Sequence, residues 1–162
     1  MANTFHVGMA DLIVITAPDT LVTLGLGSCI GLVIFDSVAK VAGMAHIMLP
    51  ESREGAPVDK PGKFANTAVP TLIDAVCKKG ALKSRLKAKF AGGAQMFAIP
   101  GSQSDFLAVG SRNIQQTTAW LNKYGIKIMD SDTGGNKGRS VEFSTETWML
   151  SVKTLGQGKK EI

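Results

Sequence analysis

Two uncharged apolar runs joined by a short polar link constrain the fold of this chain most strongly. Residues 29–35 (CIGLVIF) and 43–49 (GMAHIML) contain no Asp, Glu, Lys or Arg. The link begins with Asp36-Ser37 and includes Lys40, and short links with such turn-forming residues join neighbouring antiparallel strands. We therefore predict that the two runs pair as a β-hairpin.

The predicted hairpin brings a cysteine close to a histidine. Side chains alternate between the two faces of a strand, so Cys29 shares a face with Gly31, and His46 shares a face with Met44. Both Cys29 and His46 lie toward the open end of the hairpin, away from the turn. The two side chains can therefore come within hydrogen-bonding reach.

This pair has two interpretations. A thiolate is the nucleophile in cysteine chemistry, and it needs a nearby base because a free thiol is mostly protonated at neutral pH. The small residues Gly27 and Ser28, just before Cys29, leave backbone amides open as donors to an oxyanion. Alternatively, the cysteine packs as a small hydrophobe beside a satisfied core histidine. The pattern alone favours the packing interpretation, because isolated Cys/His pairs are common.

Thr23 is a third candidate for the same site. Its apolar neighbours predict a strand over residues 21–25, and a hydroxyl there can hold a histidine in one tautomer, which is the orienting role in a triad. The alternative is an ordinary strand threonine. Cys77, by contrast, falls on the apolar side of a predicted helix, where it is expected only to pack.

Composition agrees with one globular domain. The chain has 162 residues, of which 44% are hydrophobic and 19% charged. Strands are predicted at β-branched and apolar runs, and helices where apolar residues recur at helical spacing. The predicted strands are 12–16, 21–25, 29–35, 43–49, 86–91, 126–129, 139–144 and 147–153, and the predicted helices are 64–79 and 110–124.

These elements predict a mixed α/β fold, a single-domain layered sandwich of largely antiparallel β-sheet with two principal helices. The folded domain is expected over residues 1–155, followed by a flexible tail at 156–162. The N-terminus lacks a signal-peptide pattern, and residues 21–35 are too short and too rich in Gly and Ser to span a bilayer. We therefore expect a cytoplasmic protein that is not membrane-embedded, with free thiols at its two cysteines.

The net charge of +5 favours acidic partners. Residues 78–89 contain six Lys or Arg side chains and no acid. Little aromatic interleaving and no recognisable motif accompany them, so nucleic acid is not expected as a partner. We interpret the segment as a solvated surface, although its charge would also suit an acidic helical bundle.

Six stretches of the chain match one known family in the family's own order. They are residues 22–29 (VTLGLGSC), 43–50 (GMAHIMLP), 59–65 (DKPGKFA), 89–94 (KFAGGA), 110–113 (GSRN) and 132–141 (DTGGNKGRSV). Together they closely resemble the chemoreceptor glutamine deamidases called CheD. The resemblance implies that Cys29 is the nucleophile, His46 the base and Thr23 the third member of the catalytic site.

Two glycine pairs lie within these stretches, and each has two interpretations. Gly92-Gly93 forms the first pair, and Gly134-Gly135, followed by Asn136, forms the second. The pairs either shape loops beside the site that contact substrate or partner, or they form tight turns with no catalytic role.

The resemblance also implies a function. It implies deamidation of glutamines on the cytoplasmic helices of methyl-accepting chemotaxis receptors, where the new glutamates become methylation sites, and binding to a CheC-type phosphatase. The chemistry needs no metal or organic cofactor, and the His and Cys spacings form no recognisable zinc motif. Two alternatives stay open: hydrolysis of receptor glutamyl methyl esters, and a non-catalytic regulator that binds receptor or phosphatase.

Overall fold

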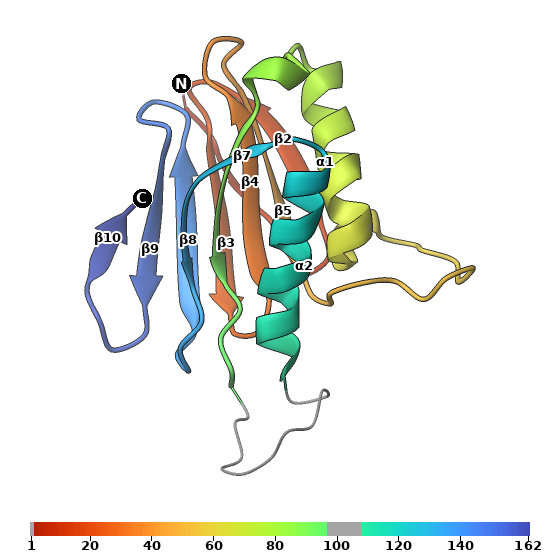
Figure 1. The fold of residues 1–162 in the computed structure, drawn as a ribbon. Helices are drawn as coiled ribbons and strands as arrows, with labels where there is room; N and C mark the ends of the chain where they lie inside the picture. Colours follow the sequence, from red (N-terminus) through yellow and green to blue (C-terminus); the bar gives the residue numbers. More distant parts are fainter. Residues whose placement is uncertain (1, 97–107) are drawn as a thin grey trace.

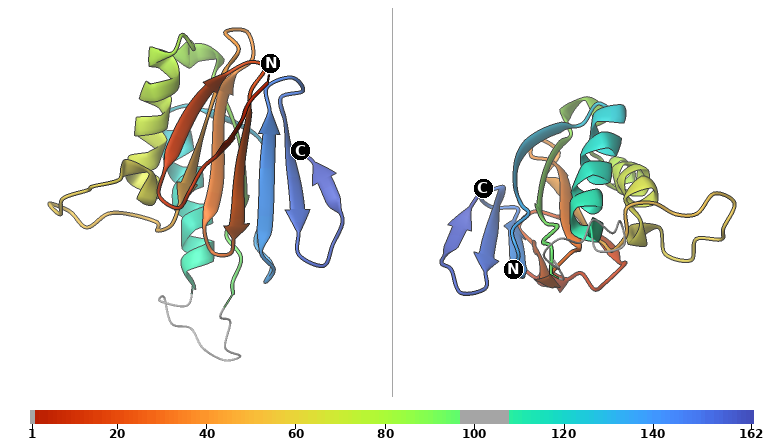
Figure 2. Two further views of the ribbon diagram at one scale, coloured as in Figure 1. Left: turned by 180° about the vertical axis from the view of Figure 1, so that it is seen from behind. Right: turned by 60° about the horizontal axis from the view of Figure 1, so that its bottom comes forward.

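The chain folds into three layers. A computed structural model describes residues 2–96 and 108–162 and, within them, shows two five-stranded sheets packed face to face (Figures 1 and 2). Helices α1 (Ala65–Lys78) and α2 (Val109–Lys123) cover the free face of one sheet, which we call the central sheet. The 3-10 turns η1 (Pro61–Lys63) and η2 (Lys83–Arg85) flank α1.

The strands of each sheet follow a fixed order. The central sheet contains β2 (Leu12–Thr16), β5 (Val41–Ile47), β4 (Ile30–Asp36), β6 (Lys87–Gly92) and β7 (Lys127–Thr133). The other sheet, the outer sheet, contains β1 (Thr4–His6), β3 (Thr20–Leu26), β8 (Arg139–Ser144), β9 (Met149–Thr154) and β10 (Lys159–Glu161). Among the described strands only β1–β3 and β6–β7 pair in parallel. The predicted α/β sandwich of largely antiparallel sheet with two helices is confirmed.

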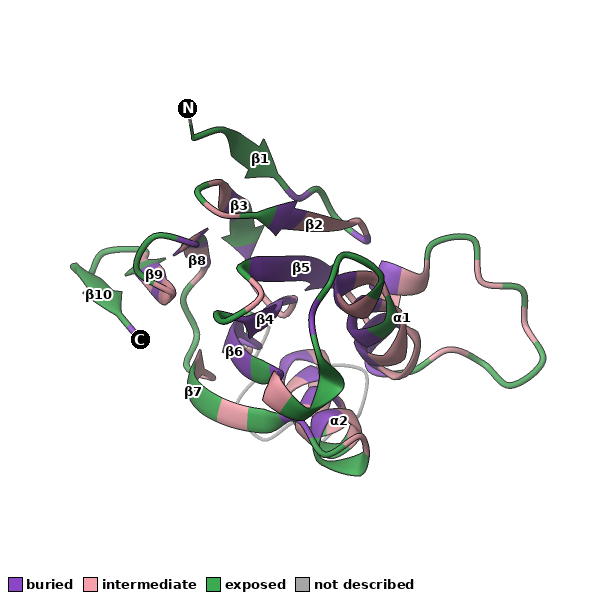
Figure 3. Ribbon diagram, turned by 90° about the horizontal axis from the view of Figure 1, so that it is seen from above, coloured by how far each residue is buried: buried purple, intermediate pink, exposed green. Residues whose placement is uncertain are grey.

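The predicted hairpin is the centre of the fold. β4 and β5 pair antiparallel, with Gly31 opposite His46, and every residue of both strands is buried (purple in Figure 3). Leu32 and its alternate neighbours face the helices, whereas Val33 and its alternate neighbours face the outer sheet. Burial on both faces explains why the two runs carry so few polar residues.

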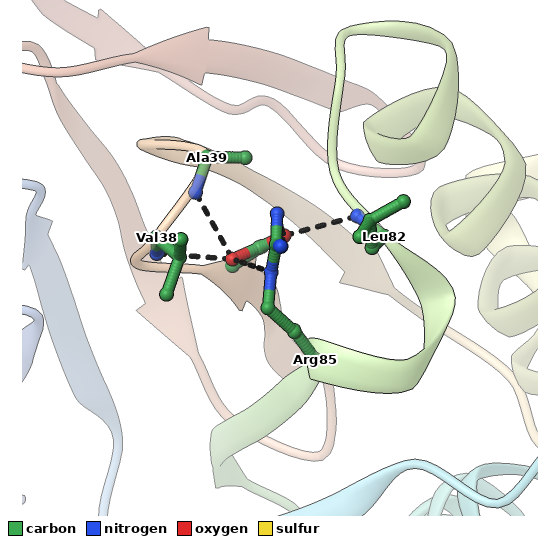
Figure 4. A network of polar contacts seen from close by, with 5 residues as sticks. Val38, Ala39, Leu82 and Arg85 are labelled. Atoms are coloured by element: carbon green, nitrogen blue, oxygen red, sulfur yellow. Dashed lines mark hydrogen bonds and ion pairs between the residues drawn. The ribbon is translucent and has the colours of Figure 1, made fainter.

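Asp36 fixes the turn at the closed end of this hairpin (Figure 4). Its buried carboxylate accepts hydrogen bonds from the backbone N–H groups of Val38 at 3.0 Å, Ala39 at 3.1 Å and Leu82 at 2.9 Å. The Arg85 guanidinium adds an ion pair at 2.9 Å. Burial alone would raise the pKa of Asp36, but the Arg85 contact and the N–H donors outweigh it and lower that pKa to about 2.

The basic segment 78–89 is less open to a partner than its composition indicates. Arg85 is engaged by Asp36, and Lys78 pairs with Asp74 at 2.8 Å. Lys89 is buried, with 8% of its surface exposed. The interpretation of this segment as one solvated surface is therefore wrong for Lys89 and incomplete for Arg85.

Within the segment 156–162, expected to be a flexible tail, Lys159–Glu161 form the edge strand β10. β10 pairs antiparallel with β9, and the backbone of Ile162 exchanges hydrogen bonds of 2.8 and 2.9 Å with Leu150. The Ile162 side chain is buried, and Lys89 Nζ donates to the carbonyls of both Trp148 and Ile162 at 2.9 Å. One buried apolar residue and one long-range lysine hold the segment, so its local composition gives no sign of its order.

Both predicted helices agree with the structure within one residue at each end. β7 runs to Thr133, four residues past its predicted end, and β1 was not predicted. Both missed segments are mostly polar and lie at sheet edges, where the apolar pattern that predicts strands is weak. Within the residues described, no helix is both long enough and apolar enough to cross a membrane.

Candidate active site

Thr23 and His46 meet between the two sheets. Thr23 lies on β3 of the outer sheet and His46 on β5 of the central sheet, and both are at least 98% buried. Thr23 Oγ1 lies 2.8 Å from His46 Nδ1. Strands from different sheets therefore supply the two side chains, and the packing of the sandwich holds them together.

The hydrogen bonds of Thr23 determine the histidine tautomer. The single hydroxyl proton of Thr23 is donated to the carbonyl of Val7 at 2.7 Å, so Oγ1 can only accept from the imidazole. His46 Nδ1 must then carry the proton, which leaves a lone pair on Nε2. Nε2 is buried and has no hydrogen-bond partner among the described residues. The ring is therefore held with a free base nitrogen.

Cys29 lies immediately before β4, on the same face of the central sheet as His46. Gly31 pairs with His46, so Cys29 is the diagonal cross-strand neighbour of the imidazole. Unlike the buried imidazole, Cys29 is only partly buried and packs at the edge of the cluster between the sheets. The sequence expectation that the hairpin brings Cys29 and His46 to one face is met, with the thiol on the more accessible side, but no hydrogen bond joins Cys29 Sγ to His46 Nε2.

Burial makes both groups neutral at rest. Burial raises the pKa of the Cys29 thiol. Burial also lowers the pKa of His46, while the charge of Asp11 acts in the opposite direction. The ground state at neutral pH is therefore a thiol beside an uncharged imidazole, in which the base is already free to accept a proton.

Gly31 gives the two sheets room to approach at this point. A Cβ on Gly31 would lie 3.1 Å from Leu26, 3.2 Å from Thr23 and 3.3 Å from Val141, tighter than ordinary van der Waals contact. Because Gly31 pairs directly with His46, its missing side chain leaves the space in which Thr23 reaches the ring.

Three successive carbonyl groups, those of Gly27, Ser28 and Cys29, hold the backbone at the nucleophile. The carbonyl of Gly27 accepts from Ala94 N at 2.9 Å, and that of Cys29 accepts from Gly93 N at 2.9 Å. Asn113 Nδ2 donates to the carbonyl of Ser28 at 2.8 Å. The N–H groups of Ser28 and Cys29 donate to no residue in the described parts of the chain. Two backbone donors beside the thiol are thus available to an oxyanion.

The two glycine pairs, for which the sequence left open a role beside the site or a plain tight turn, lie at the ends of neighbouring strands, Gly92-Gly93 at the end of β6 and Gly134-Gly135 after β7. Gly92 has φ +120°, and a side chain there would collide with the carbonyl oxygen of Cys29. The Gly92-Gly93 segment therefore packs against the backbone of Cys29. Gly134 N donates to Gly92 O at 3.0 Å, so the second pair contacts the first and not Cys29 directly.

Asn136 is exposed and lies with Gly134 and Gly135 at a cavity away from Cys29 and His46. The cavity has a volume of about 150 Å³ and is also lined by Asp132, Arg139 and Lys160. No group of three or more His, Cys, Asp or Glu side chains able to hold a metal ion occurs in the part of the chain that the structure describes.

Comparison with known proteins identifies the family. The family model described as CheD chemotactic sensory transduction matches residues 48–154. The chain belongs to the CheD family. A relative from Desulfitobacterium hafniense, named probable chemoreceptor glutamine deamidase CheD, is 48% identical over 162 residues and covers 100% of both chains. The chemoreceptor glutamine deamidase CheD of Halalkalibacterium halodurans is 47% identical over 163 residues, again with 100% of both chains covered.

A third relative extends the comparison to another organism. The chemoreceptor glutamine deamidase CheD of Thermotoga maritima is 46% identical over 154 residues, which is 95% of this chain and 94% of the relative. The family-model match begins after Cys29 and His46, whereas the two relatives covered at full length include both positions.

Sequence reasoning missed two residues at this CheD-family site. Asn113 was noted only as part of a matching stretch, yet its amide group contacts the backbone beside Cys29. Gly31 was placed on the correct face without a role. A signal for each exists only in the tertiary structure. Asn113 contacts Ser28 across 85 positions of sequence, and the three side chains that crowd Gly31 all lie on the outer sheet.

Proposed function

We propose that this CheD-family chain is a protein-glutamine deamidase that acts in the cytoplasm on methyl-accepting chemotaxis receptors. The observation that carries the proposal is the Thr23–His46 hydrogen bond, which leaves Nε2 as a free base on the sheet face of Cys29. The names of the full-length relatives, which are chemoreceptor glutamine deamidases, support the substrate class.

The first half of the reaction forms a thioester. His46 Nε2 takes the thiol proton while Cys29 Sγ attacks the carbonyl carbon of the glutamine side chain. The carbonyl π electrons move to oxygen and give a tetrahedral oxyanion. The protonated Nε2 then donates to the amide nitrogen, the C–N bond breaks, ammonia leaves and a thioester on Cys29 remains.

The second half regenerates the enzyme. Nε2 takes a proton from water as the water oxygen attacks the thioester carbonyl, and a second oxyanion forms. Collapse of this intermediate breaks the C–S bond, the sulfur regains its proton from His46, and glutamate is released. The backbone N–H groups of Ser28 and Cys29 stabilise both oxyanions, since they lie beside the nucleophile and have no competing partner in the described chain.

Thr23 acts by orienting the base. If Nδ1 lost its acceptor, the imidazole could rotate or take up its proton on Nε2, and the lone pair would no longer face the thiol. The uncharged resting state supports the same scheme, because the thiolate is generated only when His46 accepts the proton. A CheC-type phosphatase is a second proposed partner on family resemblance alone.

Peptide mass spectrometry of a receptor cytoplasmic fragment tests this function. A catalytic amount of protein should convert specific glutamines to glutamates, with more moles converted than moles of protein added and with ammonia released in step. Preferential cleavage of a matched fragment that carries glutamyl methyl esters would replace the proposal with ester hydrolysis. A stoichiometric complex with folded protein and unchanged glutamines would support a non-catalytic regulator instead.

A further inference from the structure

Asn113 holds the ends of both strands that carry the nucleophile and the base. It lies on α2 and is fully buried. Nδ2 donates to the carbonyl of Ser28 at 2.8 Å and to that of Met48 at 3.1 Å. Ser28 immediately precedes Cys29, and Met48 follows His46 by two residues. One amide group therefore joins the two strand ends just beyond the last β4–β5 pair and ties them to a helix.

We infer that Asn113 is a positioning residue that aims the backbone N–H of Cys29 at the oxyanion. This inference rests on the deamidase chemistry proposed above. The Ser28–Cys29 peptide is planar and trans, so its N–H points opposite to the carbonyl that Asn113 holds. Fixing the Ser28 oxygen thus fixes the direction of the Cys29 N–H, a donor that no described residue uses. The two hydrogen bonds of Asn113 go to Ser28 and Met48, and neither goes to Cys29 or His46.

The hydrogen bonding of Asn113 is unusual for a residue that only fills space. Both Nδ2 hydrogens are used on backbone carbonyls of the site, whereas Oδ1 is buried without a partner in the described chain. A buried acceptor without a partner destabilises the folded chain, and an apolar side chain of the same size would avoid that cost. What the asparagine adds is two hydrogen bonds to the backbone carbonyls of Ser28 and Met48.

Thr117 supplies a matched control. It lies one turn further along the same helix, is also fully buried, and its Oγ1 also lacks a partner within the described residues. It holds neither of the two carbonyls that Asn113 holds. Replacing Thr117 therefore perturbs the packing of α2 without releasing the Ser28–Cys29 peptide.

The test compares Asn113→Leu with Thr117→Val in the full-length chain. Deamidation of a receptor fragment gives kcat and KM, and alkylation of Cys29 by iodoacetamide gives the reactivity of the thiol. Asn113→Leu should lower kcat roughly 10- to 100-fold, somewhat less than loss of an oxyanion donor outright, because the N–H is misdirected and not removed. KM and the alkylation rate should stay within about 3-fold, since alkylation forms no oxyanion.

Three results would overturn the inference. They are an unchanged kcat in folded Asn113→Leu, an alkylation rate that falls in proportion to kcat, and an equal loss of kcat in Thr117→Val. If Asn113→Leu does not fold, Asn113→Ser replaces it, because serine retains one hydrogen-bond donor. A Cys29 amide resonance that shifts while kcat stays equal to that of wild type would also contradict the inference. Wild-type turnover reports separately on the proposed function, because the inference concerns only the ratio of variant to wild type.

Discussion

At the scale of single residues, the site depends on which atom carries each proton. Thr23 gives its hydroxyl proton to Val7 and accepts from His46 Nδ1, so the lone pair of the imidazole is directed to Nε2. Burial keeps both the thiol and the imidazole uncharged at rest. The nucleophile is thus activated by proton transfer during attack and not by a standing ion pair.

The roles of base and orienter should separate in kinetics. His46→Ala should lower kcat for receptor deamidation roughly 100- to 10,000-fold, because the proton acceptor is gone. Thr23→Val should cause a smaller loss, since the imidazole stays present but is less well oriented. Iodoacetamide alkylation of Cys29, measured in a Cys77→Ala background, should also slow at neutral pH in His46→Ala. Equal alkylation rates with and without His46 would show that the ring does not act on this thiol.

At the scale of elements, the β4–β5 hairpin sets the register of the site, and the Asp36 contacts set the turn of that hairpin. The carboxyl of Asp36 has a pKa of about 2 in the folded chain, against an ordinary value of 3.8. A lowered folded-state pKa stabilises the protein fully above pH 3.8, and this contribution is lost as pH falls toward 2. The shift corresponds to about 2 kcal/mol.

Asp36→Asn should therefore destabilise the chain by about 2 kcal/mol at neutral pH and flatten the acid dependence of stability. Urea unfolding between pH 2 and 5 measures both effects, with Asp74→Asn as the control, because Asp74 makes an exposed ion pair that should contribute little. Parallel stability curves for wild type and Asp36→Asn would show that this carboxylate is not the acid-sensitive group.

The hairpin and both helices could be predicted because their signals are local. Apolar runs and alternation placed Cys29 and His46 on one face, and helical spacing located α1 and α2 within a residue. β10 could not be predicted in this way, because a buried isoleucine and the distant Lys89 hold it. Asn113 escaped for the same reason: its hydrogen bonds span 85 and 65 positions of sequence, and only the folded chain brings the partners together.

At the scale of the whole molecule, two sheets and a helical layer enclose two hydrophobic cores. The site lies in the core between the two sheets. The far edge of the outer sheet is secured by Lys89, which reaches from β6 to the carbonyls of Trp148 and Ile162. Burial lowers the pKa of Lys89, because it disfavours the charged ammonium group. The hydrogen bonds to the two carbonyls stabilise that charge. The edge strand β10 is therefore coupled to the central sheet by Lys89 as well as by the buried Ile162 side chain.

Lys89→Met should release β10 while leaving deamidation intact. Two carbonyls lose their donor, so hydrogen exchange at Leu150 and Ile162 should quicken and residues 156–158 should become sensitive to protease. Lys87→Met, an exposed position on the same strand, is the control and should change neither readout. Unchanged exchange in Lys89→Met would mean that β9 and the Ile162 side chain hold the edge strand without Lys89.

The central claim is that Cys29 is the nucleophile of a multiple-turnover deamidase, and ammonia release by cysteine variants on a receptor fragment tests it most directly. Cys29→Ala should release no ammonia above background, yet keep a thermal unfolding midpoint near that of wild type and still bind the fragment. Cys77→Ala, which changes a packing residue on α1, should retain turnover. Full ammonia release by folded Cys29→Ala would contradict the account.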